Sequence, residues 1–408
     1  MNTTSETGGT KSAATCPVRF PAARENPFAP PGAYRPDGHD GGPLEVELAY
    51  GGRAWLVTRN ADVRTLFSDN RLSSDATADD YPLVPLAYRE QRPGVFLSMD
   101  PPEHERIRNL LSREFGAAAV AARRPAIEKL ATGLIDQLTA DGGRSADLVK
   151  MFADLLPCYV SGYLYGVTDY EDFARQCINA RATHDGSMAK RLVAGEKMKR
   201  FLGELIDAKE ATPGDDLLTR LLANARAAGL GRDDVIGAAT LLLAASLDAT
   251  AAVTSMTVLA VLRDPSLHQR MRQDPARWAP LAVEESLRFW TVIQHGPVRV
   301  AKQDIEIAGR TIRKGEFIVL HLHSANWDPE VFDQPERFDI DRTRNPHLAF
   351  GHGVHRCLGG GLGTLEAVVA LELLFTRMPE LHLDVPEEDL VYRHEDLVYG
   401  VRNLPVAW

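Results

Sequence analysis

The amino-acid sequence predicts a mainly α-helical protein with a minor β-sheet region, on three observations. Apolar residues recur at i, i+3 and i+4 through most of residues 103–226, which is the spacing of helices with one buried face. A longer apolar stretch, from Val235 to Leu262, predicts one long buried helix that starts near Gly231. Alternating or β-branched runs typical of strands are short and lie toward the two ends of the chain.

The first elements are a hairpin and a short helix. Residues 44–48 alternate apolar and acidic side chains, and Gly51-Gly52 then turns the chain into a second strand over residues 54–57. Asn60 is a residue type that begins helices, so we expect a helix through Phe67. Residues 73–95 contain three prolines and few periodic positions, which predicts a long loop.

The second half alternates helices, short strands and coil. A helix is expected over residues 282–289. Pro297 interrupts the helical pattern after it, and three strands follow. The strands are expected at 298–300, 305–307 and 317–320, an irregular coil at 324–350, a last helix at 358–378 and short strands from there to residue 408.

Composition excludes several classes of protein. The 408 residues include 46 Lys+Arg and 56 Asp+Glu, a net charge of −10, which argues against a general nucleic-acid or anionic-membrane binder. The four cysteines form no CxxC pair, which excludes a disulfide scaffold and indicates a cytoplasmic protein. Asp248 near the middle of the long apolar stretch would cost about 3 kcal/mol in a bilayer. We expect residues 1–26 to form a disordered leader and residues 27–408 a single domain.

The most informative segment runs from Phe350 to Gly359 and carries one cysteine on a glycine-rich turn before a helix. Backbone amides, the helix dipole, His355 and Arg356 all favour the thiolate form of Cys357. From these residues alone the cysteine is an inert structural residue, a Cys–His nucleophile or a ligand of a soft metal. A nucleotide-binding loop at residues 359–363 is excluded because irregular coil, not a strand, precedes it.

This segment resembles the heme-binding loop of the cytochrome P-450 superfamily, whose pattern is FGxGxHxCxG. All of its fixed positions are matched, including Phe350, Gly351 and Gly359. The resemblance extends from about Phe28 to Trp408. It implies a triangular single large domain with the long helix over heme b, and Cys357 as the thiolate ligand of the iron.

A second motif supports the resemblance. Glu285 and Arg288 lie three residues apart on one helix, and Arg337 follows in the sequence Pro335 to Phe338. In the family such residues form a buried group that ties the helix to the coil before the cysteine loop. We therefore expect Glu285, Arg288 and Arg337 to be structural rather than catalytic.

A third set of residues is expected to bind the heme propionates. His104 and Arg108 lie at i and i+4 of a predicted helix, so their side chains reach the same side. The resemblance implies that these two residues, together with Arg299 and His355, bind the two carboxylates. Enclosed carboxylates need charge-assisted donors, for which arginine is well suited.

The long helix departs from the family pattern at its centre. Ser246 stands where glycine is usual, Asp248 supplies the acid, and Ala249 replaces a threonine whose hydroxyl relays protons during oxygen activation. Thr250 is rotated by about 100° around the helix and is expected to face another helix. Ser246, Asp248, Ala249 and Thr250 are the candidate catalytic positions.

Three consequences of Ala249 stay open. The substrate or an ordered water supplies the hydroxyl, so that monooxygenation is preserved. Alternatively, the enzyme couples aromatic groups of aromatic or cyclic-peptide substrates by a C–C or C–N bond without inserting oxygen, or it uses peroxide or nitric oxide. A heme-binding protein without turnover is the non-enzymatic alternative.

We expect a monooxygenase that oxidises a mostly apolar natural-product-type molecule with O2. The resemblance implies electrons from a ferredoxin and its reductase, and a cytoplasmic monomer without nucleic-acid or membrane partners. The side chains expected around the substrate are mostly small and apolar. They are Leu86, Ala87, Leu242, Ala245, Val292, Ile293, Gln294 and Val398.

Overall fold

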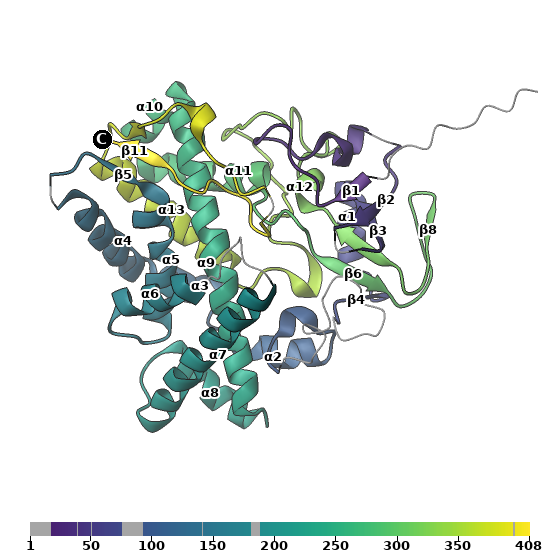
Figure 1. Ribbon diagram of the computed structural model, residues 1–408, viewed down its shortest axis with the longest axis horizontal. Helices are drawn as coiled ribbons and strands as arrows, with labels where there is room; N and C mark the ends of the chain where they lie inside the picture. The colour runs from purple at the N-terminus through teal and green to yellow at the C-terminus, as the bar shows by residue number, and fades with distance from the viewer. Residues whose placement is uncertain are drawn as a thin grey trace, which may run out of the picture.

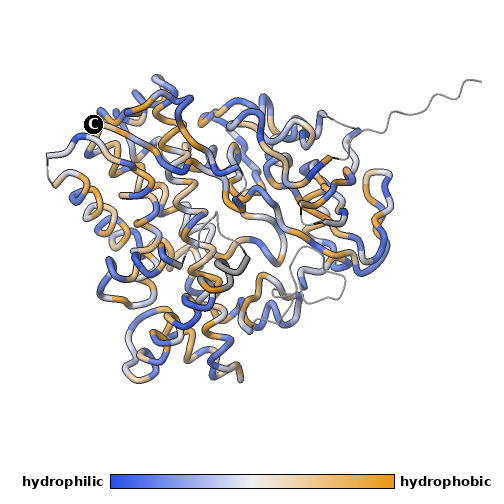
Figure 2. The backbone as a smooth tube through the Cα atoms, viewed as in Figure 1, coloured by the Kyte–Doolittle hydropathy of each residue, from blue (hydrophilic) through white to orange (hydrophobic). Residues whose placement is uncertain are grey.

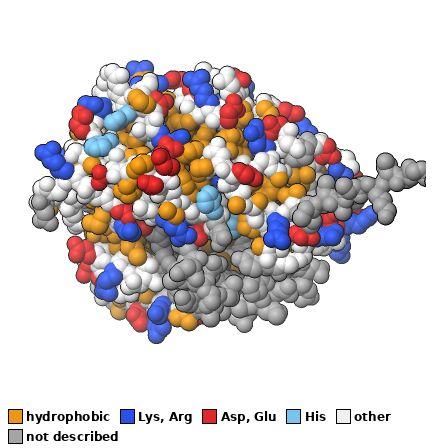
Figure 3. Space-filling view, turned by 45° about the horizontal axis from the view of Figure 1, so that its top comes forward, with side chains coloured by type: hydrophobic (Ala, Val, Ile, Leu, Met, Phe, Trp, Pro, Cys, Tyr) orange, Lys and Arg blue, Asp and Glu red, His pale blue; other side chains and the backbone are white. Residues whose placement is uncertain are grey.

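The computed structural model describes residues 18–38, 40–49, 51–75, 93–140, 142–180, 188–394 and 396–408. Within these residues a helical part and a smaller sheet-containing part lie side by side (Figure 1). Figure 2 shows hydrophobic residues along the inner helices and strands, and mostly hydrophilic connections at the outer edge. Basic and acidic side chains are interspersed across the face drawn in Figure 3.

The helices follow the predicted order. Asp264 and Asp274 cap α10 and α11 by accepting hydrogen bonds from backbone amides of the first turn, and a proline follows each cap. The helices are α1 (Asn60–Phe67), α2 (Glu103–Leu111), α3 (Ala117–Ala122), α4 (Arg124–Thr139), α5 (Leu155–Leu164), α6 (Tyr170–Ala180), α7 (Met188–Ala211), α8 (Leu217–Ala227), α9 (Arg232–Arg263), α10 (Pro265–Gln273), α11 (Pro275–Trp290), α12 (Leu322–Ala325) and α13 (Gly360–Arg377).

Three small sheets accompany them. The largest has the strand order β1 (Val18–Phe20), β2 (Leu44–Leu48), β3 (Arg53–Val57), β9 (Phe317–Leu320), β6 (Val298–Ala301) and β4 (Leu72–Ser73). The second joins β10 (His382–Leu383), β11 (Pro405–Ala407) and β5 (Ser145–Asp147), and the third joins β7 (Ile305–Ile307) and β8 (Arg310–Ile312). The predicted hairpin is confirmed, with β2 antiparallel to β3 and Leu44 opposite Leu56.

The long helix α9 is the centre of the helical part. It contacts α5, α7, α8, α10, α11 and α13. By length and composition it is the one described helix able to cross a membrane, but every residue from Thr250 to Val261 is buried inside the protein. The apolar composition of α9 is therefore explained by packing against other helices.

One expectation about order along the chain needs correction. Residues 18–20 were expected in the leader but form β1, which pairs in parallel with β2. A three-residue strand has too little periodicity to be recognised, and its partner lies 28 residues away in the sequence at Val46. The described residues of region 103–226 are mostly helical, as predicted, with β5 and a π-helix over Val149–Ala153 between α4 and α5.

Candidate functional site

The predicted glycine-rich turn presents Cys357 directly before α13. Gly351 and Gly353 have left-handed φ values of 67° and 68°. A Cβ on Gly353 would lie 2.8 Å from the carbonyl oxygen of Phe67, so a side chain there would clash with backbone. The amide of Cys357 donates to the carbonyl of Phe350 at 2.8 Å, which closes the turn. The glycines, the closing hydrogen bond and the close packing against Phe67 therefore fix where the sulfur lies.

The surroundings of the Cys357 sulfur have opposing effects on the pKa of its thiol. Burial among protein atoms raises the pKa of the thiol, whereas the amides of Gly359 and Gly360 and the guanidiniums of Arg108 and Arg356 lower it. The net pKa is raised, so the expectation that these groups favour the thiolate is only partly right. The side chain is nevertheless exposed, as for a group that lines an internal cavity. A metal ion bound to the sulfur would supply the positive charge that stabilises the thiolate.

The residues expected to bind propionates come together from separate elements. The rings of His104 in α2 and His355 in the cysteine loop lie 4.1 Å apart between centroids. His355 Nε2 is 3.1 Å from Ser74 Oγ. Arg299 of β6 is buried at 8% exposure, and Arg108 Nη2 donates to the Arg356 carbonyl at 2.6 Å. We call His104, Arg108, Arg299 and His355 the basic cluster.

The basic cluster has the properties of a binding site for anions. Both ring nitrogens of the buried His104 lack a hydrogen-bond partner among the described residues. Burial, Arg299 and His104 together lower the pKa of His355 to about 3. Buried donors of this kind are normally paired, so they are suited to enclosed carboxylates. With the thiol of Cys357 beside them, the residues fit heme, which carries two carboxylates and a soft metal ion.

The middle of α9, just before its fully buried stretch from Thr250 to Val261, is exposed on one side. Ala245 is exposed, and Leu242, Asp248 and Ala249 are half-buried. Exposed apolar residues in the middle of a core helix indicate that this side borders a cavity. We call these four residues the α9 strip.

The Ser246 hydroxyl on α9 is hydrogen-bonded within the protein, and the Thr250 hydroxyl lies against another helix. Ser246 Oγ donates to the Leu243 carbonyl at 2.9 Å and lies 3.2 Å from Ser161 Oγ of α5. Thr250 is buried, and its Oγ1 lies 3.3 Å from the position that a Cβ on Gly363 would take. The prediction that Thr250 faces another helix is confirmed, and that helix is α13.

The expected substrate contacts are brought together only in part. Ile293 and Val398 form an antiparallel bridge, which joins the turn after α11 to the C-terminal segment. Gln294 was expected as a polar contact for the substrate, but its side-chain amide donates to three backbone carbonyls and is buried. Leu86 and Ala87 lie outside the described residues.

The expected structural pair is confirmed by the geometry, but its third member is different. Arg288 donates to both Glu285 oxygens at 2.9 and 2.7 Å, and all of these atoms are buried. The second guanidinium at Glu285 belongs to Arg342, at 3.0 Å. Arg337 contributes only its backbone carbonyl, and its side chain is exposed. Arg342 lies in irregular coil, where no periodicity in the sequence marks a residue as buried.

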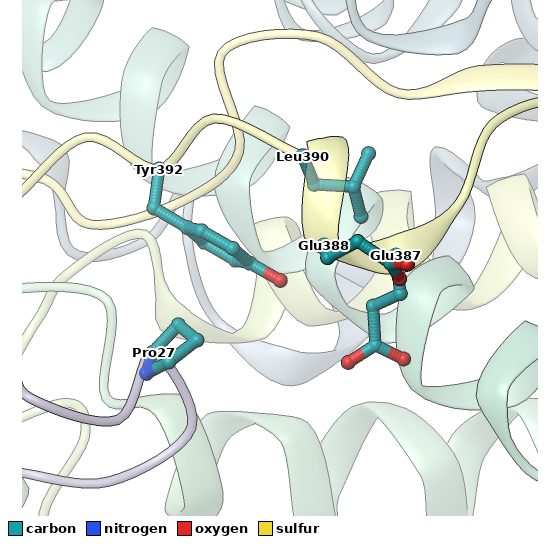
Figure 4. Close-up of a pocket in the computed structure, with 5 residues that line it drawn as sticks. All are labelled: Pro27, Glu387, Glu388, Leu390 and Tyr392. Atoms are coloured by element: carbon teal, nitrogen blue, oxygen red, sulfur yellow. The ribbon is translucent and has the colours of Figure 1, made fainter.

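A separate surface pocket carries none of these residues. It is lined by Pro27, Glu387, Glu388, Leu390 and Tyr392 (Figure 4). Glu387 there is already paired with Arg263 Nε at 2.6 Å.

In a comparison with known protein families, residues 53–379 match the family model described as cytochrome P450. Cytochrome P450 105A3 of Streptomyces carbophilus is 38% identical over 97% of this chain and 94% of its own. The 20-oxo-5-O-mycaminosyltylactone 23-monooxygenase of Streptomyces fradiae is 37% identical over 100% of this chain and 95% of its own. Among solved structures, cytochrome P450 MoxA from Nonomuraea recticatena has a TM-score of 0.89 at 36% identity, covering 96% of this chain and 98% of that one.

Proposed function

The chain belongs to the cytochrome P450 family of oxidoreductases, and from that premise we propose that it is a heme-thiolate monooxygenase of a mostly apolar natural-product-type small molecule. The observation that carries the proposal is that residues distant in the sequence come together at the cysteine loop. The ring of His104 lies 4.1 Å from that of His355, and the guanidinium of Arg108 acts on the Cys357 thiol. We further propose that residues 27–408 act as one catalytic domain, in a cytoplasmic monomer that receives electrons from a ferredoxin and its reductase.

Each group of residues has a distinct task in this proposal. Heme b, when bound, supplies the centre that oxidises the substrate with O2. Cys357 provides the thiolate ligand of the iron, and the basic cluster holds the two propionates by charge-assisted hydrogen bonds. The α9 strip and residues 292, 293 and 398 exclude water and bind apolar parts of the substrate.

The supply of protons is the unusual feature of this chain. Ala249 carries no hydroxyl, Ser246 is hydrogen-bonded to the Leu243 carbonyl and lies beside Ser161, and Thr250 is buried against α13. We therefore propose that an ordered water or a hydroxyl group of the substrate itself takes the place of the missing side chain. A substrate analogue without its hydroxyl would then bind but be oxidised poorly.

Oxidative coupling without oxygen insertion is the second candidate function. Coupling would also consume O2, electrons and protons, so Ala249 permits it only where an ordered water or the substrate delivers the protons. The printed name of the Streptomyces fradiae relative, a monooxygenase, supports oxygen insertion instead. The two reactions differ in product mass, since only monooxygenation adds one oxygen atom from O2.

The test starts with the reduced holoprotein and carbon monoxide. We expect the strongly red-shifted Soret band of a thiolate-ligated heme in the wild type. Cys357→Ala should abolish it, and Cys158→Ala, at a buried cysteine of α5, should retain it. Turnover of candidate natural products with ¹⁸O2, ferredoxin and reductase then follows by mass spectrometry. A normal band without any product from any donor would favour the heme-binding protein without turnover.

A further inference from the structure

The coil after β1 carries a buried arginine, Arg24. Its side chain belongs to a residue that is 6% exposed, and neither Nη1 nor Nη2 has a hydrogen-bond partner among the described residues. The guanidinium lies over the ring of Tyr399, with Cζ 3.5 Å from the ring centroid. The ring covers one face of the guanidinium, and this contact leaves the N–H groups at its edge available to a further acceptor.

No negative charge on the described residues balances Arg24. The neighbouring Glu25 is exposed, and its Oε2 accepts a hydrogen bond from the amide of Gly32 at 3.3 Å. The one described group whose charge acts on the pKa of Arg24 is the Tyr399 hydroxyl. Burial raises the pKa of that hydroxyl, so it is neutral at pH 7, and it donates to the Pro27 carbonyl at 2.8 Å.

The guanidinium of Arg24 nevertheless stays charged. Burial lowers its pKa only to about 10, which is well above neutral pH. The same charge lowers the pKa of the buried rings of His321 and His323, so the described surroundings of Arg24 are neutral or positive. A buried charge without a counter-charge destabilises the folded state, and proteins normally pair such charges. An anion from solution would remove this cost.

Three segments that are distant in the sequence meet at this position. Arg24 belongs to the N-terminal segment, and His321 directly follows β9. Tyr399 belongs to the C-terminal segment, and its amide donates to the Val292 carbonyl at 2.7 Å, just beyond α11. Both terminal nitrogens of Arg24 are buried, so an anion that reaches them has to be small enough to be enclosed by these segments.

We propose that Arg24 binds a small inorganic anion, chloride, at the edge of its guanidinium beside Tyr399. The ion accepts hydrogen bonds from the N–H groups of Nη1 and Nη2, which a guanidinium presents side by side. A water molecule would accept the same hydrogen bonds but leave the charge unbalanced, so the two occupants are distinguishable. The site shares no residue with the basic cluster, and the inference does not depend on the proposed function.

The experiment compares thermal unfolding of the holoprotein in sodium chloride and in sodium gluconate at equal ionic strength. Arg24→Met keeps an unbranched side chain over Tyr399 but removes the charge. We expect chloride to raise the unfolding midpoint of the wild type by about 2–4 °C relative to its effect on Arg24→Met, because an ion that binds only the folded state stabilises it. Arg19→Met, at an exposed arginine of β1, is the matched control and should keep the wild-type response.

Crystals of the holoprotein grown in sodium bromide supply a direct readout. An anomalous difference peak is expected beside Nη1 and Nη2 of Arg24 in the wild type and not in Arg24→Met. Density there without an anomalous signal would identify water and overturn the proposal, as would an equal response of wild type and Arg24→Met to chloride. If Arg24→Met does not fold, the bromide peak in the wild type decides. Loss of the carbon-monoxide band would instead refute the proposed function and leave these measurements unaffected.

Discussion

Two buried charged clusters near the cysteine loop differ in how their polar atoms are satisfied. Glu285 accepts hydrogen bonds from Arg288 and Arg342, and from the amide of Asp339 at 2.9 Å. The remaining Arg288 donors reach backbone carbonyls, including that of Asn326 at 3.0 Å. In the basic cluster, by contrast, burial and nearby arginines lower the pKa of both histidines, and both nitrogens of His104 lack a partner among the described residues.

The difference separates a structural role from a binding role. A buried charge whose partners all belong to the protein is balanced in the folded chain and needs no ligand. Buried donors that lack such partners lower stability unless something else binds them. Both clusters are made of Arg, His or Glu close to the same loop, so residue type alone does not distinguish them. The hydrogen-bond partners do.

The largest expected effect concerns the satisfied cluster. Glu285→Ala leaves two buried guanidiniums without their carboxylate and should lower the free energy of unfolding by about 3–5 kcal/mol. Urea unfolding, or the yield of folded protein, measures this. The neighbouring Glu284 binds His347 at 3.0 Å but its side chain is 47% exposed, so Glu284→Ala should cost less than about 1 kcal/mol. Equal losses in the two variants would contradict the distinction.

The next prediction tests which arginine completes that cluster. Arg342→Leu removes hydrogen bonds to a buried carboxylate and should lower the free energy of unfolding by about 1.5–3 kcal/mol. Arg337→Leu alters an exposed side chain and should change it by less than about 0.5 kcal/mol. The same urea titrations decide between the two residues, and the reverse order would show that the resemblance placed the third member correctly.

A third prediction extends the comparison to two buried histidines, His321 and His323, each with a ring nitrogen hydrogen-bonded to a protein group. Burial, followed by the charges of Arg24 and nearby His295, lowers the pKa of His321 to about 3, and burial lowers the pKa of His323 far below 6.5. In the unfolded chain both bind protons below about pH 6.5, so the unfolded state binds more protons and stability falls on acidification. The slope should be about 1.4 kcal/mol per pH unit for each histidine, and there should be none from this source above pH 7.

Unfolding measured between pH 7 and pH 5 checks this slope. His323→Gln should reduce it by the contribution of one proton, whereas His382→Gln, at an exposed histidine, should leave it unchanged. An unchanged slope in His323→Gln would show that the folded protein admits a charged histidine at that position.

The smallest expected effect on stability concerns the basic cluster. His104→Phe removes buried nitrogens without partners, so the free energy of unfolding of the apoprotein should change by less than about 1 kcal/mol. Heme should nevertheless dissociate about tenfold faster, since a hydrogen bond to a carboxylate is lost. Transfer of heme to an excess of a competing apoprotein measures the rate. Strong destabilisation without faster heme loss would place His104 with the structural residues.

Features that depend on local geometry were predictable from the sequence. The turn that presents Cys357 needs only glycines and the start of a helix, and the direction of Thr250 follows from the rotation per residue along α9. The hairpin of β2 and β3 is likewise specified by alternation and two glycines. In each case the backbone conformation or side-chain direction is set by residues within a few positions of one another, although the surfaces that Thr250 and Gly353 contact lie far away in the sequence.

Tertiary structure alone decided the rest. Arg342 rather than Arg337 reaches Glu285, Gln294 binds backbone carbonyls instead of a substrate, and residues 18–20 complete a sheet. Each of these contacts joins residues that are distant in sequence, and most lie in coil with no periodicity. Which of several chemically similar side chains is buried there depends on how the whole chain packs, because desolvation and hydrogen-bond partners are properties of the folded surroundings rather than of the residue.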